Sequence, residues 1–180
     1  MFVYKIDREI SLKLVELNDA EQLFELTDQS REHLREWLPW LDTNTKVEDT
    51  LNFIKASMKN YAEHCGINTV ILYKGKIVGV AGYNEIDWIN KIAYIGYWLG
   101  KEYEGNGIMT RVSKALTNYA FNELNLNRVE ITAAVENMKS RAIPERLGFI
   151  NEGCKRQAEW LYDHYVDHVI YAMVAADWPS

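Results

Sequence analysis

The chain has 180 residues and a mass of 21.0 kDa, the size of an ordinary globular domain. Hydrophobic residues make up 48% of the sequence and charged residues 26%, which excludes an intrinsically disordered or low-complexity chain. The net charge of −6 argues against a nucleic-acid binder that works through a global basic surface. We therefore expect a single domain over residues 1–180 that has no nucleic-acid partner.

The sequence also lacks the signals of membrane insertion and export. The longest apolar run, residues 92–99, is too short to cross a bilayer, so we expect no membrane partner. The N-terminal segment is charged and has no apolar core of a secretory signal. Cys65 and Cys154 lie far apart in the sequence, and we expect them to be reduced, with Cys154 a buried structural thiol. A cytoplasmic location follows from these patterns.

The first elements mix strand and helix patterns. Apolar and polar residues alternate over 10–17, which predicts a strand. Asn18 and Glu21 have the spacing of a capping box and predict the start of a helix. A second, short helix is expected to begin at Ser30 and to stop at Pro39, because proline cannot continue a helix.

The middle of the chain changes from helix to strand. Thr45 and Glu48 repeat the capping-box spacing ahead of an amphipathic helix that we expect to reach about Glu63. Residues 67–73 and 76–86 are apolar and β-prone, and the Lys-Gly pair between them is typical of a turn. These two segments therefore predict a β-hairpin.

The remaining elements alternate between strands and helices. Residues 92–99 form a nearly unbroken apolar run, which predicts a strand buried on both faces. Helical spacing returns from Ile108, a strand is expected over 128–135, a short helix over 139–147, and two strands from Phe149 onward. This order predicts an α/β fold with a mixed, mostly antiparallel sheet of about seven strands flanked by helices.

A glycine-bearing turn, Gly105-Asn106-Gly107, joins the apolar strand to the helix that follows it. Glycine lets backbone N–H groups approach a ligand, and a helix N-terminus favours negative charge, so we expect a pyrophosphate site; a plain tight turn is the alternative. The turn has no Gly-Lys-Ser/Thr motif of a P-loop, and Thr110 stands where a dinucleotide fingerprint has its third glycine.

A phosphate cradle beside the edge of a strand fits acetyl-coenzyme A, whose pantetheine arm can pair with strand backbone. Gly96, within the strand, is compatible with such a close approach. We therefore expect acetyl-CoA as co-substrate, held by the end of the strand, the turn and the start of the helix. The residues concerned are Tyr97, Trp98, Leu99, Glu104, Gly105, Asn106, Gly107, Ile108, Met109 and Thr110.

Two blocks carry a resemblance to a known family. The first is INKIAYIGYWL at 89–99, continuing as GNGIM at 105–109. The second is NMKS at 137–140, ERLGF at 145–149 and EGCKRQAE at 152–159. Their order and spacing resemble the GNAT superfamily of N-acetyltransferases and, within it, the RimJ/RimL branch that acetylates ribosomal proteins. The resemblance implies the GNAT fold, with a sheet splayed at the strand before the Gly-x-Gly turn.

The chain departs from this family at two positions. Glu102 stands where the acetyl-CoA signature begins with Gln or Arg, which weakens one expected contact. Pro144 stands where many members have a tyrosine that protonates the departing thiolate. The resemblance implies Ser140 as that donor instead, although Ser140 could simply cap the helix. It also implies that the backbone N–H near Leu99 polarises the acetyl carbonyl.

The remaining catalytic and cofactor residues carry alternatives. The resemblance implies Glu159 as general base, and a solvated strand residue is the other interpretation. Glu85 and Asp87, at the end of another strand, and water are further candidates for the base. Asn137 is expected to support the cofactor arm, to cap its helix, or both. A carboxylate is an adequate base for an α-amine, whose pKa is about 7.7–8.0, and a poorer one for lysine at about 10.4.

For the acceptor, the resemblance implies an aromatic wall formed by Trp37 and Trp40 with His33 nearby, together with Glu85; plain core is the alternative for the two tryptophans. Trp88 and Trp160 are candidates for a contact in a homodimer, because aromatic residues are enriched at interfaces.

His164 and His168 are residues of a type that commonly binds metal ions. On a strand, however, they would be too far apart to bind one ion, so no metal is expected. The predicted function is transfer of acetyl from acetyl-CoA to the N-terminal α-amine of a protein, with a ribosomal protein as suspected partner. The alternatives are a small-molecule amine acetyltransferase on the same scaffold and a non-catalytic acyl-CoA-binding module.

Overall fold

The computed structural model describes residues 2–179 of the chain. Its eight strands form one mixed sheet in the order β1-β2-β3-β4-β5-β6-β8-β7. The strands are β1 (Val3–Lys5), β2 (Ile10–Leu14), β3 (Ile67–Tyr73), β4 (Lys76–Asp87), β5 (Ile92–Leu99), β6 (Arg128–Ala134), β7 (Ile150–Leu161) and β8 (His164–Val174). The helices are α1 (Ala20–Gln29), α2 (Arg31–Arg35), α3 (Val47–Ala62), α4 (Ile108–Asn122) and α5 (Met138–Arg146).

The predicted α/β class is confirmed, and the sheet has one strand more than the seven expected. The additional strand is β1, which pairs antiparallel with β2. Its three residues are all exposed, so it has no alternating burial from which it could have been predicted. Among the described residues no helix combines the length and apolarity needed to cross a membrane.

The chain forms two compact units. The first contains the residues up to Gly82 together with Tyr97–Ile108, and the second contains Tyr83–Gly96 together with the residues from Met109 onward. The predicted splay of the sheet beside β5 concerns both units and stays a prediction.

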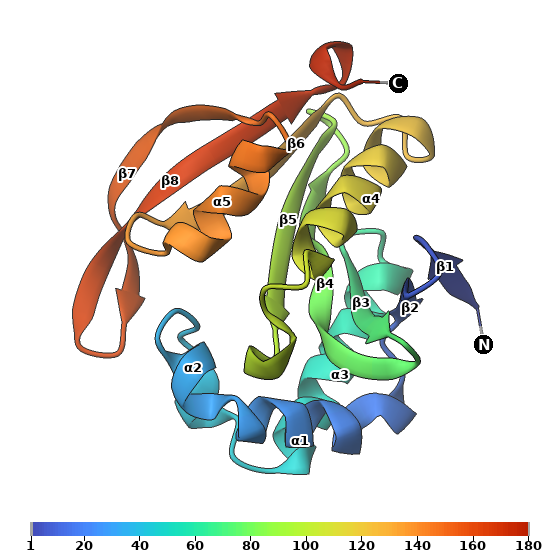
Figure 1. Ribbon diagram of the computed structural model, residues 1–180, viewed down its shortest axis with the longest axis vertical. Coiled ribbons are helices and arrows are strands. Elements are labelled where there is room, and N and C mark those ends of the chain that lie inside the picture. The colour runs from blue at the N-terminus through green and yellow to red at the C-terminus, as the bar shows by residue number, and fades with distance from the viewer. Residues whose placement is uncertain (1, 180) are drawn as a thin grey trace. The chain divides into compact units, whose positions relative to one another are not determined.

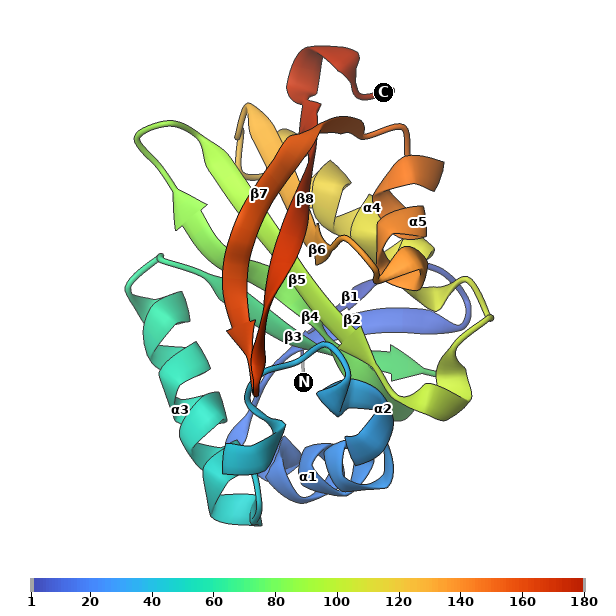
Figure 2. The same ribbon diagram turned by 90° about the vertical axis from the view of Figure 1, so that its left-hand side faces the viewer.

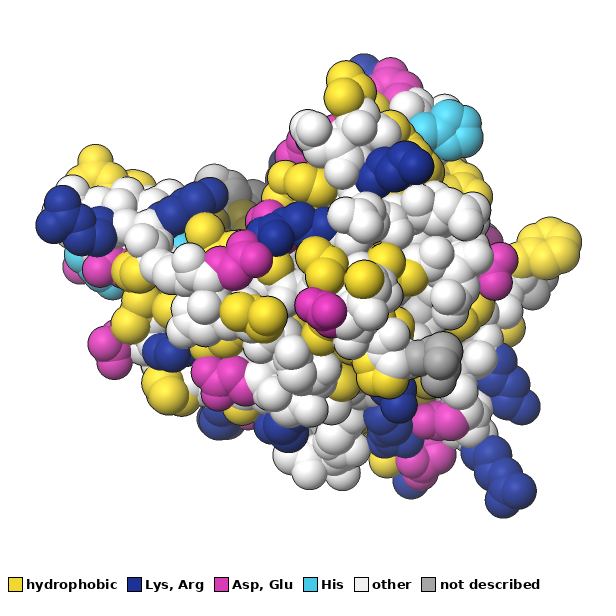
Figure 3. Space-filling model, turned by 90° about the horizontal axis from the view of Figure 1, so that it is seen from above, with side chains coloured by type: hydrophobic (Ala, Val, Ile, Leu, Met, Phe, Trp, Pro, Cys, Tyr) yellow, Lys and Arg dark blue, Asp and Glu magenta, His cyan; other side chains and the backbone are white. Residues whose placement is uncertain are grey.

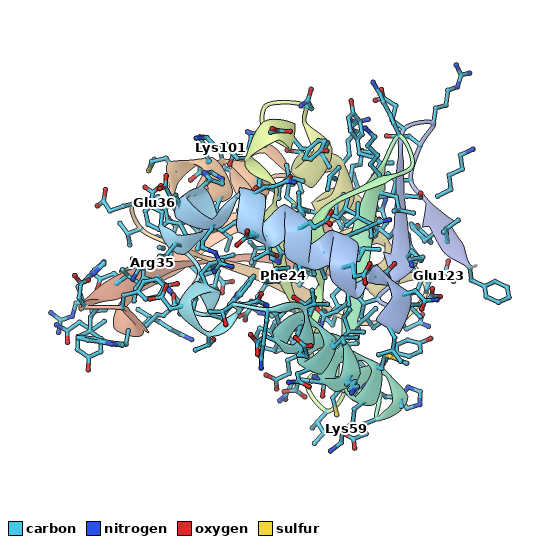
Figure 4. All side chains as sticks on the ribbon, turned by 90° about the horizontal axis from the view of Figure 1, so that it is seen from below. Phe24, Arg35, Glu36, Lys59, Lys101 and Glu123 are labelled. Atoms are coloured by element: carbon cyan, nitrogen blue, oxygen red, sulfur yellow. The ribbon has the colours of Figure 1, made fainter. Side chains whose placement is uncertain are left out.

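The first unit has a core between strands and helices. Side chains from the segment after β2 and from α1, α3, β3 and β4 form this core: Val15, Ala20, Leu23, Ile54, Val70 and Val80. Helices α1 and α3 lie side by side in this unit (Figure 1). Seen from below, Lys59 projects outward from the end of α3, as expected for the polar face of an amphipathic helix (Figure 4).

The helix starts in the first unit differ from the predicted capping pairs. The Asp19 carboxylate accepts a hydrogen bond from the Glu16 amide at 2.9 Å, so a short 3₁₀ turn precedes α1 and Asn18 is not its cap. At α3, Asp49 rather than Glu48 accepts from the Thr45 and Lys46 amides, at 2.9 and 3.1 Å. In both cases the predicted acidic capping residue is one or two positions away from the residue that has this role in the structure.

In the second unit, β5 pairs in parallel with β6, and β6 pairs antiparallel with β8. Strands β7 and β8 form a long antiparallel hairpin that twists along its length (Figure 2). Trp178, whose role no sequence pattern predicts, donates its indole N–H to Asn118 at 2.7 Å and packs against Phe121 and Phe149. It therefore fixes the C-terminal segment to α4.

Candidate active site

The Gly-x-Gly turn has the backbone that an anion cradle requires. Gly105 and Gly107 have φ angles of +78° and +65°, in the left-handed region that favours glycine. A Cβ atom at either position would point into open space, with no atom within 4 Å apart from those of the adjacent residues. Both glycines and Asn106 are exposed, and α4 begins at Ile108 directly after them. The turn therefore leaves its surroundings open to a ligand at the start of a helix.

The end of β5 approaches this turn with half-buried side chains. The sequence predicts that the strand is buried on both faces, but Tyr97, Trp98 and Leu99 are only half-buried. Trp98 packs against the core of the first unit, and its ring lies 6.1 Å from the ring of Trp40. The predicted acceptor wall and the predicted cofactor strand thus meet in one aromatic contact.

A second contact joins the predicted acceptor residues to the turn. His33 Nε2, on α2, lies 2.8 Å from Glu104 Oε1, directly before Gly105. The Lys101 amide also donates to the Ser30 hydroxyl at 3.2 Å, between α1 and α2. Arg35 lies at the other end of helix α2 (Figure 4). Its guanidinium donates to the Asp42 carboxylate and holds this end of the helix. The segment preceding the turn is therefore fixed to α2.

Ser140 lies within α5 and is not the residue that caps this helix. Asn137 is the N-cap, because its side-chain oxygen accepts from the backbone N–H of Ser140 at 3.2 Å. Ser140 precedes the buried residues Ile143 and Pro144 by three and four positions, so it lies on the helix face that packs inward. The capping interpretation of Ser140 is wrong, and that of Asn137 is confirmed.

Polar contacts hold α5 against β8. The buried Tyr171 hydroxyl donates to Glu145 at 2.6 Å and accepts from Arg141 Nε at 2.9 Å, and Arg141 also donates to the Val135 carbonyl at 2.8 Å. Burial and the Glu145 carboxylate raise the pKa of Tyr171 above its ordinary value, which keeps the phenol protonated as the donor to Glu145. Helix α5, with Pro144 inside it, is thereby anchored by side chains.

Glu159 lies just beyond an irregularity in β7. Lys155 is opposite His168 and Glu159 is opposite Val166, so β7 advances four residues where β8 advances two. Gln157, at the middle of this bulge, has a φ of +49°, and its amide donates to Asp167 at 2.6 Å. Beyond the bulge, Glu159 Oε2 lies 3.0 Å from His168 Nε2, a partner that the sequence did not reveal.

Other predicted residues lie apart from these contacts. Glu85 is exposed on β4, Met109 is buried in α4, and Thr110 is half-buried. Cys154 is exposed on β7, so the expectation of a buried thiol is wrong. β7 is an edge strand of the sheet, and all of its residues before Glu159 are exposed. Trp160 is exposed, and the centroid of its ring lies 4.8 Å from that of Tyr165.

Basic, acidic and hydrophobic side chains are interspersed over the face seen from above (Figure 3). His164 contacts Asp163 rather than His168. Among residues 2–179 there is no group of three or more side chains arranged to hold a metal ion.

Comparison with known proteins decides the family. Residues 9–150 match the model of the acetyltransferase (GNAT) domain. The chain belongs to the GNAT acetyltransferase family. It is 41% identical over 180 residues to the putative ribosomal N-acetyltransferase YdaF of Bacillus subtilis, a match that covers 99% of this chain and 98% of that protein.

Two solved GNAT structures are similar over nearly the whole chain. The microcin C7 self-immunity acetyltransferase MccE, in complex with acetyl-CoA and AMP, has a TM-score of 0.90 at 34% identity and covers 94% of each chain. RimL, the ribosomal L7/L12 α-N-protein acetyltransferase in complex with coenzyme A, has a TM-score of 0.94 at 29% identity and covers 98% of this chain and all of that one. The protein is thus an acetyl-CoA-dependent acetyltransferase whose relatives include enzymes that act on ribosomal proteins.

Proposed function

We propose that this acetyltransferase modifies the N-terminal α-amine of a protein, with a ribosomal protein as the acceptor. The observation that carries the proposal is the half-buried Glu159 carboxylate, held by His168. A carboxylate is a weak base, and it suffices for an α-amine with a pKa of about 7.7–8.0 more readily than for a lysine at about 10.4. The names of YdaF and RimL support a ribosomal acceptor.

The backbone of the turn suits the acetyl-CoA that the family uses. Its left-handed glycines open onto empty space, so Gly105 to Ile108 would hold the pyrophosphate through their N–H groups, and the end of β5 would hold the extended arm. Acetyl-CoA would supply the activated acetyl group as a thioester. The Leu99 amide would polarise the carbonyl, and Asn137 would support the arm as well as capping α5.

Two side chains would move protons. An N–C bond forms and the C–S bond breaks; Glu159 takes the proton that the amine loses, and the Ser140 hydroxyl supplies the one that the thiolate gains. Proton exchange with solvent then returns Glu159 and Ser140 to their starting states. Trp37, Trp40 and His33 would contact the acceptor.

The test is acetyl transfer to a synthetic peptide that has a free N-terminus and one internal lysine. We expect tandem mass spectrometry to locate a single acetyl group on the α-amine. The matched control is the same peptide with its N-terminus already acetylated, which should remain unmodified. Modification of the lysine in the blocked peptide would contradict the proposal. A homodimer, a cytoplasmic location and one domain over residues 1–180 remain predictions from the sequence.

A small-molecule amine is the second candidate acceptor, and one observation favours it. MccE, a similar structure, was solved with AMP as well as acetyl-CoA. Polyamines, amino acids and aminoacyl nucleotides are therefore included beside the peptide. A higher kcat/KM for any of these than for the free peptide would favour this alternative.

A further inference from the structure

His168 contacts the carboxylate to which we assign the role of base. Its Nε2 lies 3.0 Å from Glu159 Oε2, and the two side chains are 20% and 27% exposed. Every residue of β7 from Ile150 to Ala158 is exposed, so Glu159 is the first residue along this strand to be partly shielded from solvent. The pair therefore lies at the first position along β7 where a polar side chain is partly buried.

The register of the hairpin places the pair on one face. Glu159 is directly opposite Val166, and His168 is two residues beyond Val166 on β8, so their side chains share a face. The bulge makes this contact: without its two additional residues, the position opposite Val166 would be occupied by Gln157. The Gln157 amide is bound to Asp167, and the Asp167 carbonyl accepts from the Val135 amide at 2.9 Å. The bulge is thus fixed to the segment that leads into α5.

We propose that His168 is a positioning residue for Glu159. The inference rests on the function proposed above. An ionised carboxylate can only accept hydrogen bonds, so His168 must donate through Nε2–H. That bond holds Oε2 in place and fixes the plane of the carboxylate. The other oxygen, Oε1, is then the atom that accepts the proton of the amine. A third group that orients a catalytic base is a recurrent device, here with imidazole as the orienting group.

Two substitutions separate the donor from the ring. His168→Gln retains an N–H donor, and His168→Phe retains a ring and removes the donor. We expect His168→Phe to lower kcat for the free peptide by about 10-fold to 100-fold with KM little changed, since a misplaced base slows the chemical step. We expect His168→Gln to recover most of that loss. The matched control is His164→Phe, which should retain full activity. His164 is exposed, lies on the same strand as His168 and contacts Asp163.

A double-mutant cycle shows whether His168 acts through Glu159. On a Glu159→Gln background, His168→Phe should lower kcat by less than about twofold further, because residues that act as a unit are not additive. Equal loss in His168→Gln and His168→Phe, or full additivity with Glu159→Gln, would overturn the inference. Unchanged kcat in His168→Phe would overturn it while leaving the proposed function intact. Absence of transfer by the wild-type enzyme would overturn the proposed function and, with it, this one.

A measurement without turnover gives independent evidence. Long-range ¹H–¹⁵N NMR of the imidazole in the acetyl-CoA-free protein reports which ring nitrogen carries the proton. We expect the Nε2–H form for His168 in the wild type at neutral pH. A neutral ring protonated only on Nδ1 would overturn the inference whatever the kinetics, since its Nε2 could not donate.

Discussion

Ser140 contributes to the cap of α5 through its backbone. The Ser140 amide donates to Asn137, and substitution by alanine leaves that N–H in place. We therefore expect Ser140→Ala to keep the cap of α5 and to lower kcat, by about 100-fold, more than it lowers the affinity for acetyl-CoA. Steady-state kinetics and calorimetric titration with acetyl-CoA measure the two effects. Lys139→Ala, the exposed neighbour, is the control, and an unaltered kcat in Ser140→Ala would refute its role as acid.

Single residues were predictable where the chain itself carries the signal. Asn137 has the residue type and position of a helix cap, and the structure gives it that role. The partners of Glu159 and Glu104 were not predictable, because His168 and His33 reach them through strand register and helix placement. A hairpin pattern indicates that two strands pair, but a bulge changes which side chains meet across it.

At the scale of elements, Arg128 on β6 joins its strand to β7 across β8. Its guanidinium contacts both oxygens of the Glu152 carboxylate and also Glu130 Oε1 at 2.8 Å. The hydrogen bond from Arg128 lowers the pKa of Glu152 below its ordinary value. A carboxyl group with a lowered pKa in the folded state stabilises the fold above its unfolded-state pKa, and this contribution is lost as the pH falls through the folded-state pKa.

Glu152→Gln should therefore lower the free energy of unfolding at pH 7 by about 0.5–1 kcal/mol, a modest loss because the carboxylate is partly exposed. The difference from wild type should shrink once the pH drops below the ordinary glutamate pKa of about 4.3, where Glu152 begins to be protonated in the unfolded state. Urea unfolding at pH 7 and at successively lower pH measures both values. A difference that stays constant with pH would contradict the assignment of the stability to this ion pair.

The element order was predictable from periodicity, because long amphipathic helices and β-hairpins repeat their pattern over many residues. The bulge of β7 was not, because Gln157 adopts a positive φ that glutamine rarely takes, and tertiary contacts with Asp167 hold it there. The three-residue β1 was missed for the opposite reason: it is too short and too exposed to show any period.

At the scale of the whole molecule, binding of acetyl-CoA should raise the stability of the fold. A ligand at about 100 times its Kd adds about 2.7 kcal/mol to the free energy of unfolding, which for a chain of this size corresponds to a rise in Tm of roughly 5–10 °C. The acidic net charge of −6 gives no long-range attraction for this anion, so we expect the gain to come from local contacts, with the backbone of the turn as the proposed pyrophosphate site.

Gly107→Val should abolish this rise, because a β-branched side chain both disfavours the φ of +65° and fills the open space in front of the turn. Strain alone would lower Tm, so each variant is compared with its own value without acetyl-CoA. Gly75→Val is the matched control: Gly75 has a φ of +80° and equally open surroundings, but it lies in the turn between β3 and β4. We expect Gly75→Val to lose stability and keep the full rise with acetyl-CoA. A normal rise in Gly107→Val would show that the turn does not hold the pyrophosphate.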